Sequence, residues 1–178
     1  MNRGDLIYLI GVPGAGKTTL AKELFQPVKG VVMTKPFLHV VHPGGVELGG
    51  PRDKFAGTDA LPMNVQPLVL PFLLNNVWDL AFAEGDRLAN GKFFDACTAA
   101  GWTVHVVLLD APEGLAAARR TARGSTQAET WVKGRVTKVG RLWASYGAIR
   151  LDASEPTSVL ASRLAKYPPM ARLLGGRA

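Results

Sequence analysis

Residues 11–18 hold the clearest chemical pattern in the sequence. They read Gly-Val-Pro-Gly-Ala-Gly-Lys-Thr, the spacing of glycines, lysine and threonine that is typical of a phosphate-binding loop. Because glycine has no Cβ, consecutive backbone N–H groups can turn inward and surround phosphate oxygens at the positive end of the following helix. The predicted phosphate-binding residues are Gly11, Pro13, Gly14, Ala15, Gly16, Lys17, Thr18 and Thr19.

Lys17 and Thr18 have separate expected roles within this loop. We expect Lys17 to reach the β- and γ-phosphates of a nucleoside triphosphate and the Thr18 hydroxyl to hold Mg²⁺. An apolar run at 6–10 predicts a buried strand before the loop, and residues 19–25 have helical spacing after it. A glycine-rich turn that matches by chance is the alternative, but the order of strand, loop and helix favours a phosphate site.

Two acidic residues follow a second predicted strand, at 78–83. These are Glu84 and Asp86, and either can position the Mg²⁺ shell or accept the proton of an acceptor hydroxyl. Asp86 is favoured for this work because the neighbouring Arg87 can hold the acceptor. The alternative is that one of the two carboxylates only caps the following helix.

The positive charge of the chain is concentrated in one segment. The formal net charge is +7, and between residues 119 and 150 the only acidic residue is Glu129. The basic residues there are Arg119, Arg120, Arg123, Lys133, Arg135, Lys138, Arg141 and Arg150. Arg119 and Arg123 lie one helical turn apart, and with Arg135 and Lys138 opposite they are predicted to form a lid over the γ-phosphate. A solvated basic face is the alternative.

Several further residues are candidates for ligand binding. Thr58 and Asp59 end a long polar loop at 49–59, and Asp59 is either an acceptor-site residue or a helix cap. Trp131 can stack on a base or simply pack. His39 and His42 can line an acceptor pocket, whereas His105 alternates within a strand and suits the core.

Composition limits the class of protein. The chain has 178 residues, enough for one domain (1–178) with a sizeable core, and no apolar segment long enough for a membrane span. We expect no cleavable signal before the first strand. The only cysteine, Cys97, cannot form an internal disulfide and sits among apolar helix residues, so we expect a buried thiol and a cytoplasmic protein.

Strands alternate with helices along most of the chain, which predicts an α/β fold with a largely parallel sheet covered on both faces. Strands are expected at 28–33, 78–83, 103–109 and 148–151, a β-hairpin at 38–48, and a kinked helix at 62–76. The tail from Pro168 has little to hold it except Met170, Leu173 and Leu174. Ligands of parallel sheets bind at the carboxyl edge, where the loop, Glu84 and Asp86 converge.

Taken together, these motifs resemble the P-loop nucleoside and nucleotide kinases over residues 6–166. The resemblance rests on the phosphate loop, the Asp86-Arg87 pair, the basic lid at 119–141 and residues 152–154 near the adenine end. It implies a three-layer P-loop NTPase sandwich, similar to nucleoside monophosphate kinases, with ATP and Mg²⁺ as cofactors. The hairpin and residues 48–63 replace the usual monophosphate-binding helices, so 34–76 is expected to be an acceptor-binding insertion.

Residues 48–63, 84–90 and 123–135 look like those of small bacteriophage-type kinases, some of which phosphorylate 5-hydroxymethyluracil in phage DNA. This resemblance implies a DNA-base acceptor and, for a phage protein, the host cytoplasm. Three functions remain open: a kinase for a nucleobase hydroxyl in DNA, a kinase for a free nucleoside or nucleotide, and an ATP-dependent switch. In each, Lys17, Asp86, Arg119, Arg123 and Arg135 are the expected catalytic residues. Asp59, Arg87, Thr58, Trp131 and Lys138 are expected to bind the acceptor.

Overall fold

The computed structural model describes residues 3–26, 30–50, 56–75 and 78–174. Parts of several predicted segments lie outside the described residues. These are 28–29 of the strand at 28–33, 51–55 of the loop at 49–59, residue 76 of the kinked helix at 62–76, both 51–55 and 76 of the insertion at 34–76, and the corresponding parts and both ends of the 1–178 domain. None of the described helices is long and apolar enough to span a membrane.

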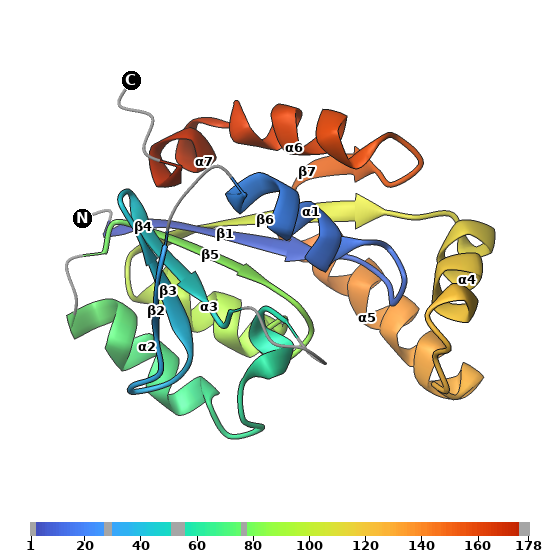
Figure 1. Ribbon diagram of the computed structural model, residues 1–178. Coiled ribbons are helices and arrows are strands. Elements are labelled where there is room, and N and C mark those ends of the chain that lie inside the picture. The colour runs from blue at the N-terminus through green and yellow to red at the C-terminus, as the bar shows by residue number, and fades with distance from the viewer. Residues whose placement is uncertain (1–2, 27–29, 51–55, 76–77, 175–178) are drawn as a thin grey trace.

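Within these residues, seven strands form one sheet in the order β2-β3-β4-β5-β1-β6-β7 (Figure 1). The strands are β1 (Gly4–Ile10), β2 (Val31–Met33), β3 (His39–His42), β4 (Gly45–Leu48), β5 (Leu80–Glu84), β6 (Trp102–Asp110) and β7 (Gly147–Asp152). From β4 to β7 all neighbours are parallel, while β3 is antiparallel to β2 and β4. The predicted parallel sheet and the hairpin are both confirmed.

Helices cover the sheet on two sides and make three layers. They are α1 (Lys17–Phe25), the 3₁₀ turn η1 (Thr58–Ala60), α2 (Gln66–Asn75), α3 (Gly91–Ala99), α4 (Glu113–Ala122), α5 (Glu129–Tyr146), α6 (Thr157–Ala165) and α7 (Pro168–Leu173). In Figure 1, α1, α6 and α7 lie on one face, with α2, α3 and α5 on the other. The predicted kinked helix is α2, which begins at Gln66 and contains Pro71.

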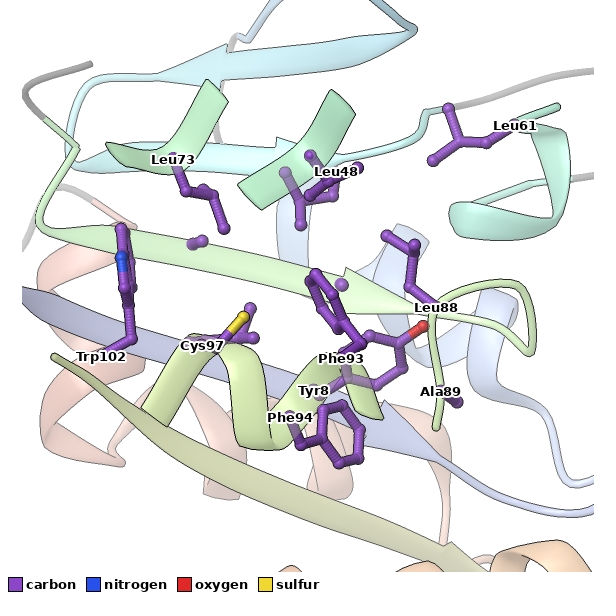
Figure 2. Packing of buried hydrophobic residues seen from close by; sticks show 14 of the residues in the cluster. Tyr8, Leu48, Leu61, Leu73, Leu88, Ala89, Phe93, Phe94, Cys97 and Trp102 are labelled. Carbon is purple, nitrogen blue, oxygen red and sulfur yellow. The ribbon is translucent and has the colours of Figure 1, made fainter. Parts of the chain in front are cut away.

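Each face of the sheet has its own apolar core. β1 is buried along its whole length, as expected for a central parallel strand, and alternates its side chains between the two cores. Figure 2 shows the core beneath α3, where Tyr8, Phe93, Phe94 and Cys97 pack together. Cys97 is fully buried in this core, and burial raises the pKa of its thiol to about 12, as suits a packing residue rather than a nucleophile.

The tail from Pro168 is held by apolar residues that the sequence offered for this, because α7 buries Met170 and Leu173 in the second core. One expectation from the sequence was wrong. His39 and His42 do not line an acceptor pocket but are buried in the hairpin, where His39 Nδ1 lies 2.8 Å from the Phe37 carbonyl oxygen. The alternation of apolar and polar residues along the hairpin strands does not by itself specify which face of the hairpin packs on the core.

Candidate active site

The parallel register brings the phosphate-binding loop next to the end of β5. Leu9 of β1 pairs with Glu84, and the loop follows Ile10 directly. In the loop, Gly14 (φ 89°) and Gly16 (φ 103°) occupy the left-handed region that disfavours side chains, and α1 starts at Lys17. The N–H groups of the first helical turn therefore open onto this edge of the sheet.

Lys17 is partly buried, and its ammonium donates to the Gly11 carbonyl oxygen at 2.8 Å. Burial lowers the pKa of Lys17, while the negative charge of Glu84 acts in the opposite direction. Arg123 lies close enough for its positive charge to add to the lowering. The loop thus holds a desolvated cation beside an anionic side chain, a setting in which electrostatic interactions with phosphate oxygens are strong.

Thr18 and Glu84 form an oxygen-rich pair at the foot of the loop. The Thr18 hydroxyl donates to Glu84 Oε1 at 3.0 Å, and Glu84 is only 3% exposed. Burial raises the pKa of Glu84, against the lowering effects of Lys17 and of the Thr18 hydrogen bond. A hydroxyl and a carboxylate are hard oxygen ligands that suit Mg²⁺, which binds proteins through one or two such groups and completes its shell with phosphates and water.

No cluster of three or more His, Cys, Asp or Glu side chains in the described residues could hold a metal alone. Neither Glu84 nor Asp86 caps the next helix, because Asn90 is the N-cap of α3 and accepts from the Phe93 N–H at 2.9 Å. Both carboxylates are therefore free of the capping role that was the alternative.

A hydrogen-bond network fixes the loop after β5. The hydroxyl of Tyr8 donates to the Gly85 carbonyl at 3.1 Å and lies 3.2 Å from Thr58 Oγ1. Asp59 Oδ1 accepts the N–H groups of Asp86 (2.8 Å) and Arg87 (3.2 Å). Asp59 therefore links η1 to the loop that follows β5 and does not act as a helix cap. The network sets the positions of three acidic side chains relative to the phosphate loop.

Gly57 allows η1 to come this close to β5. A Cβ at Gly57 would collide with the backbone and the carboxylate of Glu84, and its φ of 58° also excludes most side chains. The insertion therefore lies directly against the proposed metal ligand.

Asp86 is paired with two cations from α5. Its Oδ2 lies 2.5 Å from Arg135 Nη1, and its Oδ1 accepts from Lys138 Nζ at 2.8 Å. The Arg135 guanidinium also lies over the Trp131 ring, 4.9 Å from its centroid. These ion pairs hold α5 against the loop after β5, so that α5 forms one wall of the site.

A cavity of about 520 Å³ joins these parts. The sequence-predicted residues that line it are Gly11, Pro13, Gly14, Gly16, Lys17, Thr18, Asp59, Glu84, Asp86, Arg87, Arg123, Trp131, Arg135 and Lys138. They come from segments far apart in the chain, and the cavity runs from the phosphate loop to the loop after β5. It therefore has one end suited to phosphates and another, lined by Asp59, Asp86 and Arg87, for a second molecule.

Four predicted residues do not line this cavity. Arg119 donates instead to the carbonyl oxygens of Ala15 (2.8 Å) and Ala153 (3.0 Å), so it contacts the backbone of the phosphate loop rather than the cavity. Thr58 is fully buried beneath the site and contacts Tyr8. The remaining two are Ala15, which is buried, and Thr19, which is exposed at the start of α1.

Sequence reasoning missed several residues of the cavity wall, among them Arg120 and Met63. Arg120 lines the cavity and donates to the Pro13 carbonyl oxygen at 2.8 Å. Met63 lies at the acceptor end, where its sulfur contacts Arg87 Nη1. The one-turn spacing of Arg119 and Arg123 indicated those two residues, and no such spacing marked Arg120. No local signal marked Met63.

This fold and site define a P-loop phosphotransferase of the kinase type. The chain belongs to the P-loop Nucleotide Kinase3 family, whose family model matches residues 2–155. P-loop kinases use ATP, typically with Mg²⁺. None of the curated proteins matches the chain.

Solved structures share the fold at low sequence identity. A sugar kinase from Janibacter sp. HTCC2649 has a TM-score of 0.57 and 16% identity, covering 96% of this chain and 98% of its own. The Deinococcus radiodurans tunicamycin resistance protein has a TM-score of 0.55 and 20% identity, covering 91% and 94%. A gluconokinase from Sinorhizobium meliloti 1021 has a TM-score of 0.53 and 12% identity, covering 98% and 96%.

Proposed function

We propose that this kinase transfers the γ-phosphate of ATP to a hydroxyl group of a nucleobase, specifically 5-hydroxymethyluracil in phage DNA. The observation that carries the transfer reaction is the cavity that joins the phosphate loop to the carboxylates of Asp59, Glu84 and Asp86. The acceptor oxygen forms the new bond to phosphorus, the bond to the β,γ-bridging oxygen breaks, and ADP leaves.

Thr18 and Glu84 are the proposed Mg²⁺ ligands, and the ion would neutralise charge on the β- and γ-phosphates. Lys17 binds the same phosphates. Arg123 and Arg135 supply positive charge from the proposed lid at 119–141, in which Arg123 affects Lys17 electrostatically. These residues stabilise the transferred group, while little covalent chemistry is needed from the protein.

Asp59 is our proposed general base. One of its oxygens is held by two backbone N–H groups, and among the described residues its other oxygen has no cationic partner. Both oxygens of Asp86 are already engaged, by Arg135 and Lys138. Asp86 therefore suits the task of holding α5 and the acceptor loop together better than the proton transfer that the sequence favoured for it.

The DNA acceptor is supported by the basic segment and by Trp131. Trp131 is 38% exposed at the cavity rim, where an extruded base could stack on it. Arg87 lines the acceptor end, has no carboxylate partner in the described part of the chain, and keeps its Nε buried without a hydrogen bond. A guanidinium in this state suits an anionic or carbonyl group of the acceptor.

A free small molecule is the second candidate acceptor. The cavity volume of about 520 Å³ must also hold the triphosphate, which leaves room for a compact acceptor. The similar solved structures include a sugar kinase and a gluconokinase. A free nucleoside, a nucleoside monophosphate or a sugar acid would each satisfy this constraint.

Transfer of label from γ-³²P-ATP separates these acceptors. The panel contains single-stranded and duplex DNA with 5-hydroxymethyluracil, the same DNA with thymine, the free nucleoside and its monophosphate, and gluconate. Label on the hydroxymethyluracil DNA alone supports the proposal, and label on a free compound supports the second candidate. ATP hydrolysis that no acceptor accelerates would indicate a nucleotide-dependent switch instead.

Lys17→Ala is the site control for this panel, and Lys22→Ala is its matched surface variant. Lys22 is exposed on the same helix, so its replacement should leave transfer unchanged. Lys17→Ala should abolish transfer to every acceptor while the fold is retained. Unchanged turnover in Lys17→Ala would contradict the site assignment.

A further inference from the structure

Helix α4 lies directly against the phosphate-binding loop. The approach is closest at Gly14, where a Cβ would collide with the carbonyl oxygen of Ala116 in α4. No side chain fits between the loop backbone and the helix backbone at this point. Helix α4 is therefore in a position to shape the loop itself.

Two consecutive arginines of α4 each hold one carbonyl of the loop. Arg120 Nη1 donates to the Pro13 oxygen at 2.8 Å, and Arg119 Nη1 donates to the Ala15 oxygen at 2.8 Å. The second branch of Arg119 reaches the Ala153 oxygen at 3.0 Å and so anchors the guanidinium to the segment after β7. Arg120 is likewise anchored by Glu113 at 2.7 Å.

A trans peptide is planar, so its C=O and the N–H of the next residue point in opposite directions. Because Arg120 holds the Pro13 carbonyl oxygen, the N–H of Gly14 points away from the Arg120 guanidinium. Because Arg119 holds the Ala15 carbonyl oxygen, the N–H of Gly16 likewise points away from the Arg119 guanidinium. Both glycines line the cavity. Within the described residues, no hydrogen bond uses either of these two N–H groups.

We propose that Arg119 and Arg120 are positioning residues that orient the phosphate-binding N–H groups of Gly16 and Gly14, respectively. Glycine peptides rotate easily, so a glycine-rich loop needs outside contacts to keep its N–H groups preorganised. The two arginines supply them by fixing alternate peptide planes. This inference rests on the proposed ATP-binding role of the loop and is independent of the acceptor.

The test uses the full chain with ¹⁵N-labelled glycine, titrated with Mg²⁺ and a non-hydrolysable ATP analogue. In the wild-type protein the Gly14 and Gly16 amide signals should both shift on binding. Arg119→Met should lose the Gly16 response and keep that of Gly14, and Arg120→Met should do the reverse. Each variant should weaken binding of the analogue about 10- to 100-fold, the range for a lost hydrogen bond from a charged group.

Arg163→Met is the matched control, because Arg163 lies on α6 and pairs only with Glu155 among the described residues. It should bind as the wild type does. If a Met variant fails to fold, Arg119→Gln and Arg120→Gln carry the test. A glutamine side chain ends well short of the loop carbonyl that each guanidinium holds, so each Gln variant should lose the glycine response of its own peptide.

Three results have distinct meanings. The inference is overturned if Arg119→Met and Arg120→Met, or the Gln variants where they replace them, keep wild-type affinity and both glycine responses. Simultaneous loss of both responses in either Met variant also overturns it, because it contradicts separate control of the two peptide planes. If the wild-type protein does not bind the ATP analogue, that result would instead contradict the proposed function.

Discussion

The Thr18 hydroxyl donates a 3.0 Å hydrogen bond to Glu84 Oε1, although 66 residues separate the two in the chain. Parallel pairing of β1 with β5 creates this contact, since Leu9 lies opposite Glu84 and the loop follows one residue later. The pair joins the first residues of α1 to the edge of the sheet. Any ion bound there would contact both the phosphate loop and the end of β5.

Glu84→Gln should reduce the rate of phosphoryl transfer by at least about 100-fold, because a neutral amide is a poor ligand for Mg²⁺ and several kcal/mol of charge stabilisation would be lost. Steady-state kinetics at varied Mg²⁺ measures the effect. The variant should also require more Mg²⁺ for half-maximal activity. A rate within a few-fold of wild type would exclude Glu84 as a metal ligand.

The same variant should be more stable than wild type at alkaline pH. Because burial raises the pKa of Glu84, the folded state holds the proton more tightly than the unfolded chain does. The stability that protonation supplies is present below the ordinary glutamate pKa and is lost as the pH rises through the raised value. Glu84→Gln should therefore raise Tm by a few degrees at pH 8, with a difference that shrinks toward pH 4. Thermal unfolding measured across the pH range tests this prediction. Glu23→Gln is the control, because Glu23 is an exposed residue of α1.

The strand, loop and helix of the phosphate-binding segment could be predicted because this motif depends on residues adjacent in sequence. Glycines, lysine and threonine at fixed spacing are sufficient to define the strand, loop and helix. Glu84 was also predictable, since a carboxylate at the end of a buried strand must lie at the carboxyl edge of a parallel sheet. In both cases local pattern determines where the side chain lies.

The contacts of the arginines could not be predicted in this way. Arg119 and Arg123 share a helical face, but the sequence does not specify how α4 is rotated against the loop. Packing of Gly14 on Ala116 sets that rotation, and it brings Arg119 and Arg120 onto loop carbonyls. Similarly, the two cations on Asp86 depend on how α5 crosses the loop after β5.

Gly14→Ala should weaken ATP binding by at least about tenfold, because the new methyl group would push the loop away from α4 and the φ of 89° disfavours alanine. Gly134→Ala is the contrasting variant. Its methyl group would meet nothing within 4 Å on α5, so it should stabilise the helix by about 0.5–1 kcal/mol. Calorimetric titration with ATP and chemical denaturation measure the two effects. Equal ATP affinity in the two variants would contradict the close packing of the loop.

Asp59→Asn should lower kcat about 100-fold or more with little effect on ATP affinity. The amide oxygen can still accept the N–H groups of Asp86 and Arg87, while the amide nitrogen cannot take up a proton. Asp86→Asn should act mainly on the KM for the acceptor, because it frees Arg135 and Lys138 and loosens α5. Single-turnover and steady-state kinetics separate the two outcomes. A larger loss of kcat in Asp86→Asn than in Asp59→Asn would return the role of base to Asp86.

Trp131 provides the sharpest test of a base acceptor, since its ring lies at the cavity rim with Arg135 over it. If a base stacks on this ring, Trp131→Ala should raise the KM for the acceptor about 5- to 100-fold, the range for loss of one stacked base. Trp131→Phe should recover much of that loss, because it keeps an aromatic face. Kinetics with hydroxymethyluracil DNA at constant ATP measures both. A similar KM for all three proteins would mean that the ring only supports Arg135, and stacking on Trp131 would no longer favour the DNA acceptor.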